Sequence, residues 1–125
     1  MAKVTLIGHS YIRRVENAYE SGRVPRRGPA DMHLQFVGVG GGKVTGPVGA
    51  KNLFGYIERV RRFDADVIFV HIGENDLQWS HPFDVRQQII RFIEELAARC
   101  RPWKIVIGQI TRFPATAHLD RDANW

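Results

Sequence analysis

Three short segments of this chain carry residue types that could do chemistry together. Gly8-His9-Ser10 follows an apolar run, glycines cluster from Gly38 to Gly42, and Gly73-Glu74-Asn75-Asp76 follows another apolar run. A serine hydroxyl can act as a nucleophile, while backbone N–H groups and an asparagine amide can stabilise the negative charge that forms on an attacked carbonyl. The segments therefore predict acyl-transfer chemistry, provided that the fold brings them together.

The hydrophobic pattern predicts the elements that must position these segments. Apolar runs predict strands, and apolar residues at helical spacing predict helices between them. The strands are expected at Lys3–Ile7, Met32–Val39, Val67–Ile72 and Lys104–Ile110, and the helices at Tyr11–Tyr19, Ala50–Phe63 and Pro82–Arg99. This alternation favours parallel strands with helices on both faces. We therefore predict an α/β fold of three layers, α/β/α, with a flavodoxin-like parallel sheet. The three segments then lie at the carboxyl edge, where such sheets carry their sites.

Length and composition fit a single domain spanning residues 1–125. The chain is 44% hydrophobic, which suffices for a modest core. Its longest apolar runs are too short to span a bilayer, and the first strand begins too early to leave room for a secretion signal. We therefore expect a cytoplasmic protein without a membrane span. Cys100 is the only cysteine, so no disulfide can form within the chain, and an inert thiol is expected.

The charge balance permits an acidic partner. The formal net charge is +5, and arginine supplies most of the cations. Most arginines fall on the polar faces of predicted helices, where solvation explains them. Arg23, Arg26 and Arg27 form the one local basic cluster, in a loop expected from Ser21 to Asp31. The net positive charge would attract a nucleic acid at long range, so a nucleic acid is one candidate partner.

Each of the three segments also has a plainer interpretation. Ser10 could simply cap the helix that follows it, since serine is common at that position. Gly73, Asn75 and Asp76 could form an ordinary turn, and the glycine cluster could be a flexible loop. The glycines match neither a phosphate-binding P-loop nor a dinucleotide fingerprint, and Gly8-His9-Ser10 is not part of a Gly-x-Ser-x-Gly elbow.

Taken in order, the three segments resemble the sequence blocks of the SGNH, or GDSL-type, hydrolase superfamily. Gly8-His9-Ser10 matches the block that supplies the nucleophile, Gly41 best matches the second-block glycine with Gly40 as the alternative, and Gly73-Glu74-Asn75-Asp76 matches the Gly-x-Asn-Asp block. The resemblance covers nearly the whole chain. The Gly-His-Ser variant followed by two arginines is similar to esterase-like domains in animal reading frames, some of them in retroelements.

The sequence departs from the family pattern in two ways. His9 replaces the usual aspartate of the first block, a residue that supports the turn. The family's base histidine and its orienting aspartate come from a C-terminal Asp-x-x-His block, and this sequence contains no such block. We therefore expect the domain to lack its last helix and strand, and the general base to come from outside this chain.

None of the chain's own histidines is a good substitute for that base. His9 adjoins Ser10 but is expected to point elsewhere, and His71 is expected to be a packed core histidine in its strand. His33 and His81 open a strand and a helix, where both should be solvated. His118 lies in the right part of the chain beside Asp120 and Asp122, but in reversed order.

The resemblance implies acyl-ester hydrolysis of a small-molecule ester. Ser10 would attack the carbonyl, and the N–H groups of Ser10 and Gly41 with the Asn75 side chain would hold the oxyanion. No metal or organic cofactor is implied, and the oligomeric state stays open. Without a base this chain could be inactive. The alternatives are a non-catalytic module that binds a ligand or partner, and a nucleic-acid-associated accessory domain of a retroelement-like protein.

Overall fold

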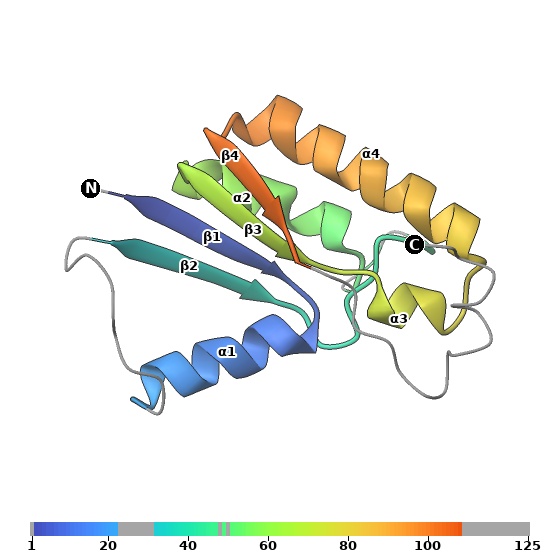
Figure 1. Ribbon diagram of the computed structural model, residues 1–125, viewed down its shortest axis with the longest axis horizontal. Coiled ribbons are helices and arrows are strands. Elements are labelled where there is room, and N and C mark those ends of the chain that lie inside the picture. Colours follow the sequence, from blue (N-terminus) through green and yellow to red (C-terminus); the bar gives the residue numbers. More distant parts are fainter. Residues whose placement is uncertain (1, 23–31, 48, 50, 109–125) are drawn as a thin grey trace.

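The computed structural model describes residues 2–22, 32–47, 49 and 51–108, which form an α/β fold around a parallel sheet. Its four strands are β1 (Lys3–Gly8), β2 (His33–Gly38), β3 (Val67–His71) and β4 (Lys104–Ile107). They lie in the order β2-β1-β3-β4 and are all parallel (Figure 1). The predicted strands and the predicted parallel sheet are confirmed. The loop expected after Thr111 and most of the Ser21–Asp31 loop fall outside the described residues.

Helices cover both faces of the sheet. They are α1 (Ser10–Glu20), the 3-10 helix η1 (Leu53–Tyr56), α2 (Ile57–Phe63), the short α3 (Glu74–Leu77) and α4 (Pro82–Cys100). Helix α1 lies on one face, where Tyr19 contacts Phe36 of β2. Helices α2 and α4 pack together on the other face (Figure 1). The three-layer prediction is therefore confirmed.

The prediction of one continuous helix over Ala50–Phe63 is wrong. Leu53–Tyr56 is a 3-10 helix, and the α-helix begins only at Ile57. The side chain of Asn52 accepts a hydrogen bond from the Phe54 N–H at 2.9 Å and so caps η1. Asparagine is a strong helix-capping residue, so the helical segment begins after Asn52, at Leu53, three residues later than expected.

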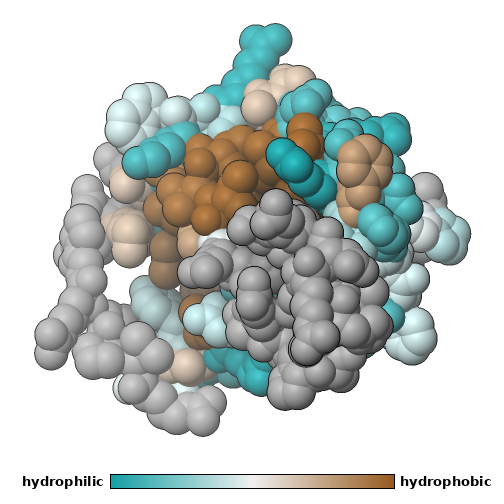
Figure 2. Space-filling model, turned by 45° about the vertical axis from the view of Figure 1, so that its right-hand side comes forward, coloured by the Kyte–Doolittle hydropathy of each residue, from teal (hydrophilic) through white to brown (hydrophobic). Residues whose placement is uncertain are grey.

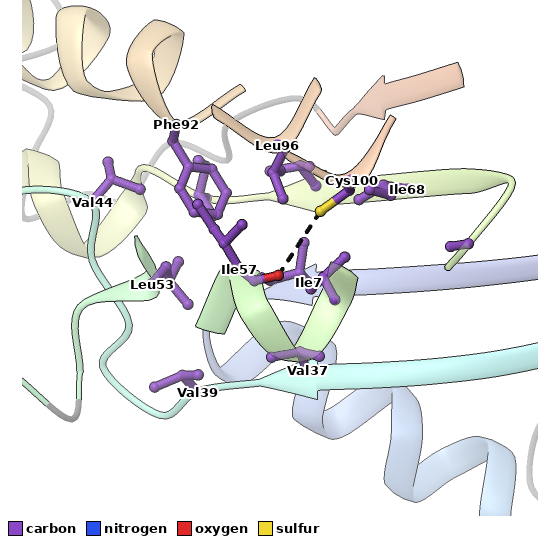
Figure 3. Packing of buried hydrophobic residues seen from close by; sticks show 14 residues of the cluster. Ile7, Val37, Val39, Val44, Leu53, Ile57, Ile68, Phe92, Leu96 and Cys100 are labelled. Atoms are coloured by element: carbon purple, nitrogen blue, oxygen red, sulfur yellow. Dashed lines mark hydrogen bonds between the residues drawn. The ribbon is translucent and has the colours of Figure 1, made fainter. Parts of the chain in front are cut away.

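The hydrophobic core lies between the sheet and the helices α2 and α4. The strands contribute Ile7, Val37 and Ile68, and α4 contributes Phe92 and Leu96, all at most 1% exposed (Figure 3). Cys100 belongs to the same core. Its thiol donates a hydrogen bond of 3.9 Å to the Ile57 carbonyl, and burial raises its pKa. A buried thiol with a raised pKa is a poor nucleophile, so the structure agrees with the prediction of an inert cysteine.

The outer strand β4 leaves apolar side chains uncovered. Val106 is 36% exposed, Ile107 56% and the preceding Trp103 84%. Figure 2 shows a continuous hydrophobic area on one face of the molecule, bordered by hydrophilic side chains. Among the residues described, no helix packs over β4 on the face that carries α1 (Figure 1). No helix in the described part of the chain is both long and apolar enough to cross a membrane.

Arginine charges in the described residues are partly paired. Glu58 forms ion pairs with the guanidinium groups of Arg61, Arg62 and Arg99. The hydrogen bonds from Arg61 lower the Glu58 pKa to about 2. The basic cluster of Arg23, Arg26 and Arg27 lies outside the described residues, so its expected contact with nucleic acid stays a prediction.

Candidate active site

The three segments singled out in the sequence meet at the carboxyl edge of the sheet. Gly8 at the end of β1 pairs with Gly38 of β2 on one side and with His71 of β3 on the other, so the three strand ends are level. Beyond this level the Val39 N–H donates to the Gly8 carbonyl at 2.9 Å. The strands therefore deliver a serine, a glycine loop and the segment containing Asn75 to neighbouring positions on one edge.

Ser10 is the first residue of α1 and is half-buried. The interpretation of Ser10 as the helix cap is wrong, because His9 is the cap and its Nδ1 accepts a hydrogen bond from the Tyr11 N–H at 3.2 Å. No other described residue forms a hydrogen bond with the Ser10 hydroxyl. This hydroxyl is thus not engaged in capping, and it lies at a helix N-terminus, where the helix dipole favours negative charge.

The glycine loop after β2 contains a turn that needs glycine at one position. Gly41 has a φ of +70°, which side-chain-bearing residues rarely adopt, whereas the alternative Gly40 has no positive φ. The Gly42 N–H donates to the Val39 carbonyl at 2.9 Å and closes the turn. Neither the Gly41 N–H nor the Ser10 N–H has a hydrogen-bond acceptor among the described residues. Both donors are therefore available to a ligand.

Asn75 lies on the short helix α3, directly after β3. Gly73 precedes this helix with a φ of +113°, so the chain turns sharply at the strand end. The Asn75 side chain donates a hydrogen bond of 3.1 Å to the Gly42 carbonyl. An amide NH2 group has two hydrogens, so this bond orients the group and leaves the second hydrogen for another acceptor.

Asp76 holds the glycine loop in place, a role that the sequence did not indicate. Its carboxylate is fully buried and accepts hydrogen bonds from the Val44 N–H at 3.1 Å, the Thr45 N–H at 2.9 Å and the Thr45 hydroxyl at 2.5 Å. Burial raises the Asp76 pKa, while the bonds from Thr45 and Val44 act in the opposite direction. No local pattern could reveal this role, because the partners lie about thirty residues apart.

A second polar contact joins the first and third segments. The Nε2 atom of His9 lies 2.7 Å from Oε2 of Glu74, and Nε2 of His71 lies 3.1 Å from Oε1 of the same carboxylate. All three side chains are buried. The predictions that His9 points away from Ser10 and that His71 is buried are in line with this arrangement, but the part played by Glu74 was missed.

None of the histidines that the structure describes forms a hydrogen bond with Ser10. His33 and His81 are exposed, as predicted, and His81 caps α4 through its Nδ1. His118 lies outside the described residues. The prediction that the base comes from elsewhere therefore stays open, and the described part of the site holds a serine with candidate oxyanion donors.

Comparison with solved structures identifies the class of fold. A structure described as an arylesterase from Agrobacterium tumefaciens superposes with a TM-score of 0.61 at 13% identity, over 86% of this chain and 62% of that one. An acetyl xylan esterase superposes with a TM-score of 0.60 at 16% identity, over 98% and 69% of the two chains. An α/β hydrolase from the metagenome of Lake Arreo, Spain, gives a TM-score of 0.57 at 18% identity, over 98% and 69%.

These likenesses confirm the predicted fold: the chain has the α/β architecture of esterases and acylhydrolases, of the kind that the SGNH resemblance implied. At such low identity they establish the fold and not the reaction. The chain spans 62% of the Agrobacterium structure and 56% of a structure described as an acylhydrolase from Bacteroides fragilis. No protein-family model matches the sequence, and no curated protein is similar enough to it to count as a relative.

Proposed function

We propose that this chain carries the nucleophile and the oxyanion site of a serine hydrolase that acts on small acyl esters. The observation that carries the proposal is the arrangement at the sheet edge. The Ser10 hydroxyl is unengaged among the described residues, and the glycine loop beside it is tied to Asn75 by a 3.1 Å hydrogen bond. The esterases and acylhydrolases that share the fold support the choice of ester substrates.

The proposed reaction follows the chemistry of an activated serine. The Ser10 oxygen attacks the ester carbonyl and gives its proton to a general base, and the carbonyl oxygen becomes negatively charged. The N–H groups of Ser10 and Gly41 and the free amide hydrogen of Asn75 donate to this oxyanion. Collapse of the intermediate expels the alcohol, and water then releases the acid from the serine. The family resemblance implies that this base is a histidine.

Labelling with a fluorophosphonate probe tests the nucleophile. Because no histidine of the described residues forms a hydrogen bond with Ser10, we expect slow labelling that added imidazole accelerates by acting as an external base. Mass spectrometry should place the label on Ser10, and Ser10→Ala should abolish it. Ser21→Ala, which changes an exposed serine of the next loop, is the matched control and should label like the wild type. A folded wild-type protein that stays unlabelled in imidazole would overturn the proposal.

Asn75→Ala tests the oxyanion donor. Loss of one oxyanion donor lowers the rate of an acyl-transfer step by about 100-fold or more, so we expect labelling of Ser10 in imidazole to slow by roughly this factor. Asn17→Ala, on the exposed surface of α1, serves as the control and should leave the rate unchanged. Equal rates for Asn75→Ala and the wild type would remove Asn75 from the site. Circular dichroism would verify that each variant is folded.

A non-catalytic binding module of the same fold is the second candidate, and a hollow beside the glycine loop favours it. This hollow of about 340 Å³ is lined by Lys43, Thr45, Lys51 and Asn52 among others. The Lys51 ammonium lies 3.5 Å from the position that a Cβ atom on Gly41 would take. Binding of acetate that shifts the NMR signals of Gly41 and Lys51 equally in wild type and Ser10→Ala, without any labelling, would favour this candidate.

A further inference from the structure

Two histidines and a glutamate converge at the sheet edge without a part in the proposed reaction. His9 comes from the N-cap of α1, His71 from the end of β3 and Glu74 from the start of α3. They are 5%, 8% and 2% exposed, respectively. One strand and two helix N-termini therefore bring three ligand-bearing side chains into the protein interior at one point.

The donor atoms of this cluster have the composition of a metal site. One ligand atom from each residue lies within 4.8 Å of the others. Two imidazole nitrogens and a carboxylate form the protein ligand set of several catalytic zinc sites, in which a fourth position stays open. We propose that His9, His71 and Glu74 bind a divalent transition-metal ion such as Zn²⁺.

The spacing of the donors is close to what such an ion needs. Zinc–nitrogen and zinc–oxygen bonds of about 2.0–2.1 Å place tetrahedral ligand atoms roughly 3.3 Å apart. The observed contacts to the Glu74 carboxylate are 2.7 Å from His9 and 3.1 Å from His71. The two contacts to the carboxylate must therefore lengthen by a few tenths of an ångström when an ion enters, and ligand atoms that are up to 4.8 Å apart must draw together around it.

The helix cap predicts a local consequence of metal binding. The His9 Nδ1 atom accepts the Tyr11 N–H, so the proton of the neutral ring lies on Nε2 and faces Glu74. An ion bound at Nε2 displaces this proton, and a neutral ring then carries its proton on Nδ1. The Tyr11 N–H loses its acceptor, so metal binding must change the environment of this amide.

The site would join two segments that matter for the proposed chemistry. His9 directly precedes Ser10, and Glu74 directly precedes Asn75. An ion held by both residues fixes the position of the serine relative to the asparagine. The inference itself rests on the geometry of the cluster, so it stands or falls separately from the proposed esterase reaction.

Metal titration of the purified chain, with any affinity tag removed, tests the site. We expect one Co²⁺ ion per chain with the visible absorption of tetrahedral cobalt, and displacement of Co²⁺ by Zn²⁺. Loss of a hydrogen-bond partner of a metal ligand typically weakens metal binding by roughly 10–100-fold. Removal of a residue that binds the ion directly should weaken it at least as much. This result is expected for His71→Gln and for Glu74→Gln. His33→Gln, an exposed histidine on β2, is the matched control and should bind like the wild type.

Several results would overturn the proposal. They are an absence of metal binding by the wild-type chain, a metal affinity of Glu74→Gln equal to that of the wild type, and loss of metal binding in His33→Gln. If the cluster variants fail to fold, a zinc titration of the wild-type chain still tests the proposal. One equivalent of Zn²⁺ must then shift the backbone amide NMR signal of Tyr11. An unchanged Tyr11 amide in the presence of bound zinc would place the ion elsewhere. Labelling of Ser10 is measured separately, so failure of that reaction leaves the metal site standing.

Discussion

Gly8→Ala is expected to lower the free energy of unfolding by about 3 kcal/mol or more, because overpacking against the backbone costs this much when no flexible group can move away. A Cβ atom on Gly8 would lie 2.1 Å from the His71 carbonyl oxygen and 2.9 Å from Cγ1 of Ile12. The φ of Gly8 is not positive, so the expected cost comes from the lack of space and not from backbone strain. Strands β1 and β3 must separate, or α1 must shift.

Gly55→Ala provides the matched control for this substitution. Gly55 lies in η1, and an added Cβ would meet no atom within 4 Å. We expect its stability to stay within about 0.5 kcal/mol of the wild type, as for most surface substitutions. Urea unfolding followed by circular dichroism measures both variants. Equal stabilities of Gly8→Ala and Gly55→Ala would contradict the prediction, because they would show that the strand ends move apart at little cost to make room for the added Cβ atom.

The cost at Gly8 connects the fold to the proposed site. The residue is level with the ends of the two neighbouring strands, and the segment containing Ser10 begins directly after it. A forced separation of β1 from β3 would also lengthen the 2.7 Å contact between His9 and Glu74. Gly8→Ala should therefore slow the labelling of Ser10 even under conditions where the protein remains folded.

The sequence predicted the fold well because most of its signals are local. An apolar run predicts a strand, and Pro82 predicts the start of α4 because proline suits the first turn of a helix. Locality also explains the errors. Serine and histidine can both cap a helix, and the contact of His9 with Glu74, 65 residues away, orients the histidine ring for this role. The apolar spacing from Ala50 onward could not show that Asn52 begins a 3-10 helix.

The sequence predicted the place of the candidate site but not its supports. Ser10, Gly41 and Asn75 were identifiable because each follows a strand, and parallel strands bring their carboxyl ends to one edge. The contacts that hold these three residues in place join segments that are distant in the sequence. Glu74 and Asp76 lie in the same short segment as Asn75, yet their partners belong to other strands and loops. Only the register of the sheet shows which distant residue each carboxylate meets.

Asp76→Ala is expected to destabilise the protein by about 3 kcal/mol, because it leaves buried hydrogen-bond donors without an acceptor. The donors are the N–H groups of Val44 and Thr45 and the Thr45 hydroxyl. These groups belong to the loop that follows Gly41 and Gly42. The variant should therefore also loosen the proposed oxyanion site and slow the labelling of Ser10. Urea unfolding and the labelling rate measure the two effects.

Asp76→Asn separates the hydrogen bonds from the charge. Asparagine keeps one oxygen acceptor and no charge, so it should cost less than alanine. Burial raises the Asp76 pKa above its ordinary 3.8, so folding favours the protonated form. The wild type should therefore lose stability as the pH rises from below the ordinary carboxyl pKa through the higher pKa of the folded protein. Asp76→Asn should lack this decrease. A wild type that instead gains stability over this pH range, relative to Asp76→Asn, would mean that the three hydrogen bonds outweigh burial and that the loop is held by a charged carboxylate.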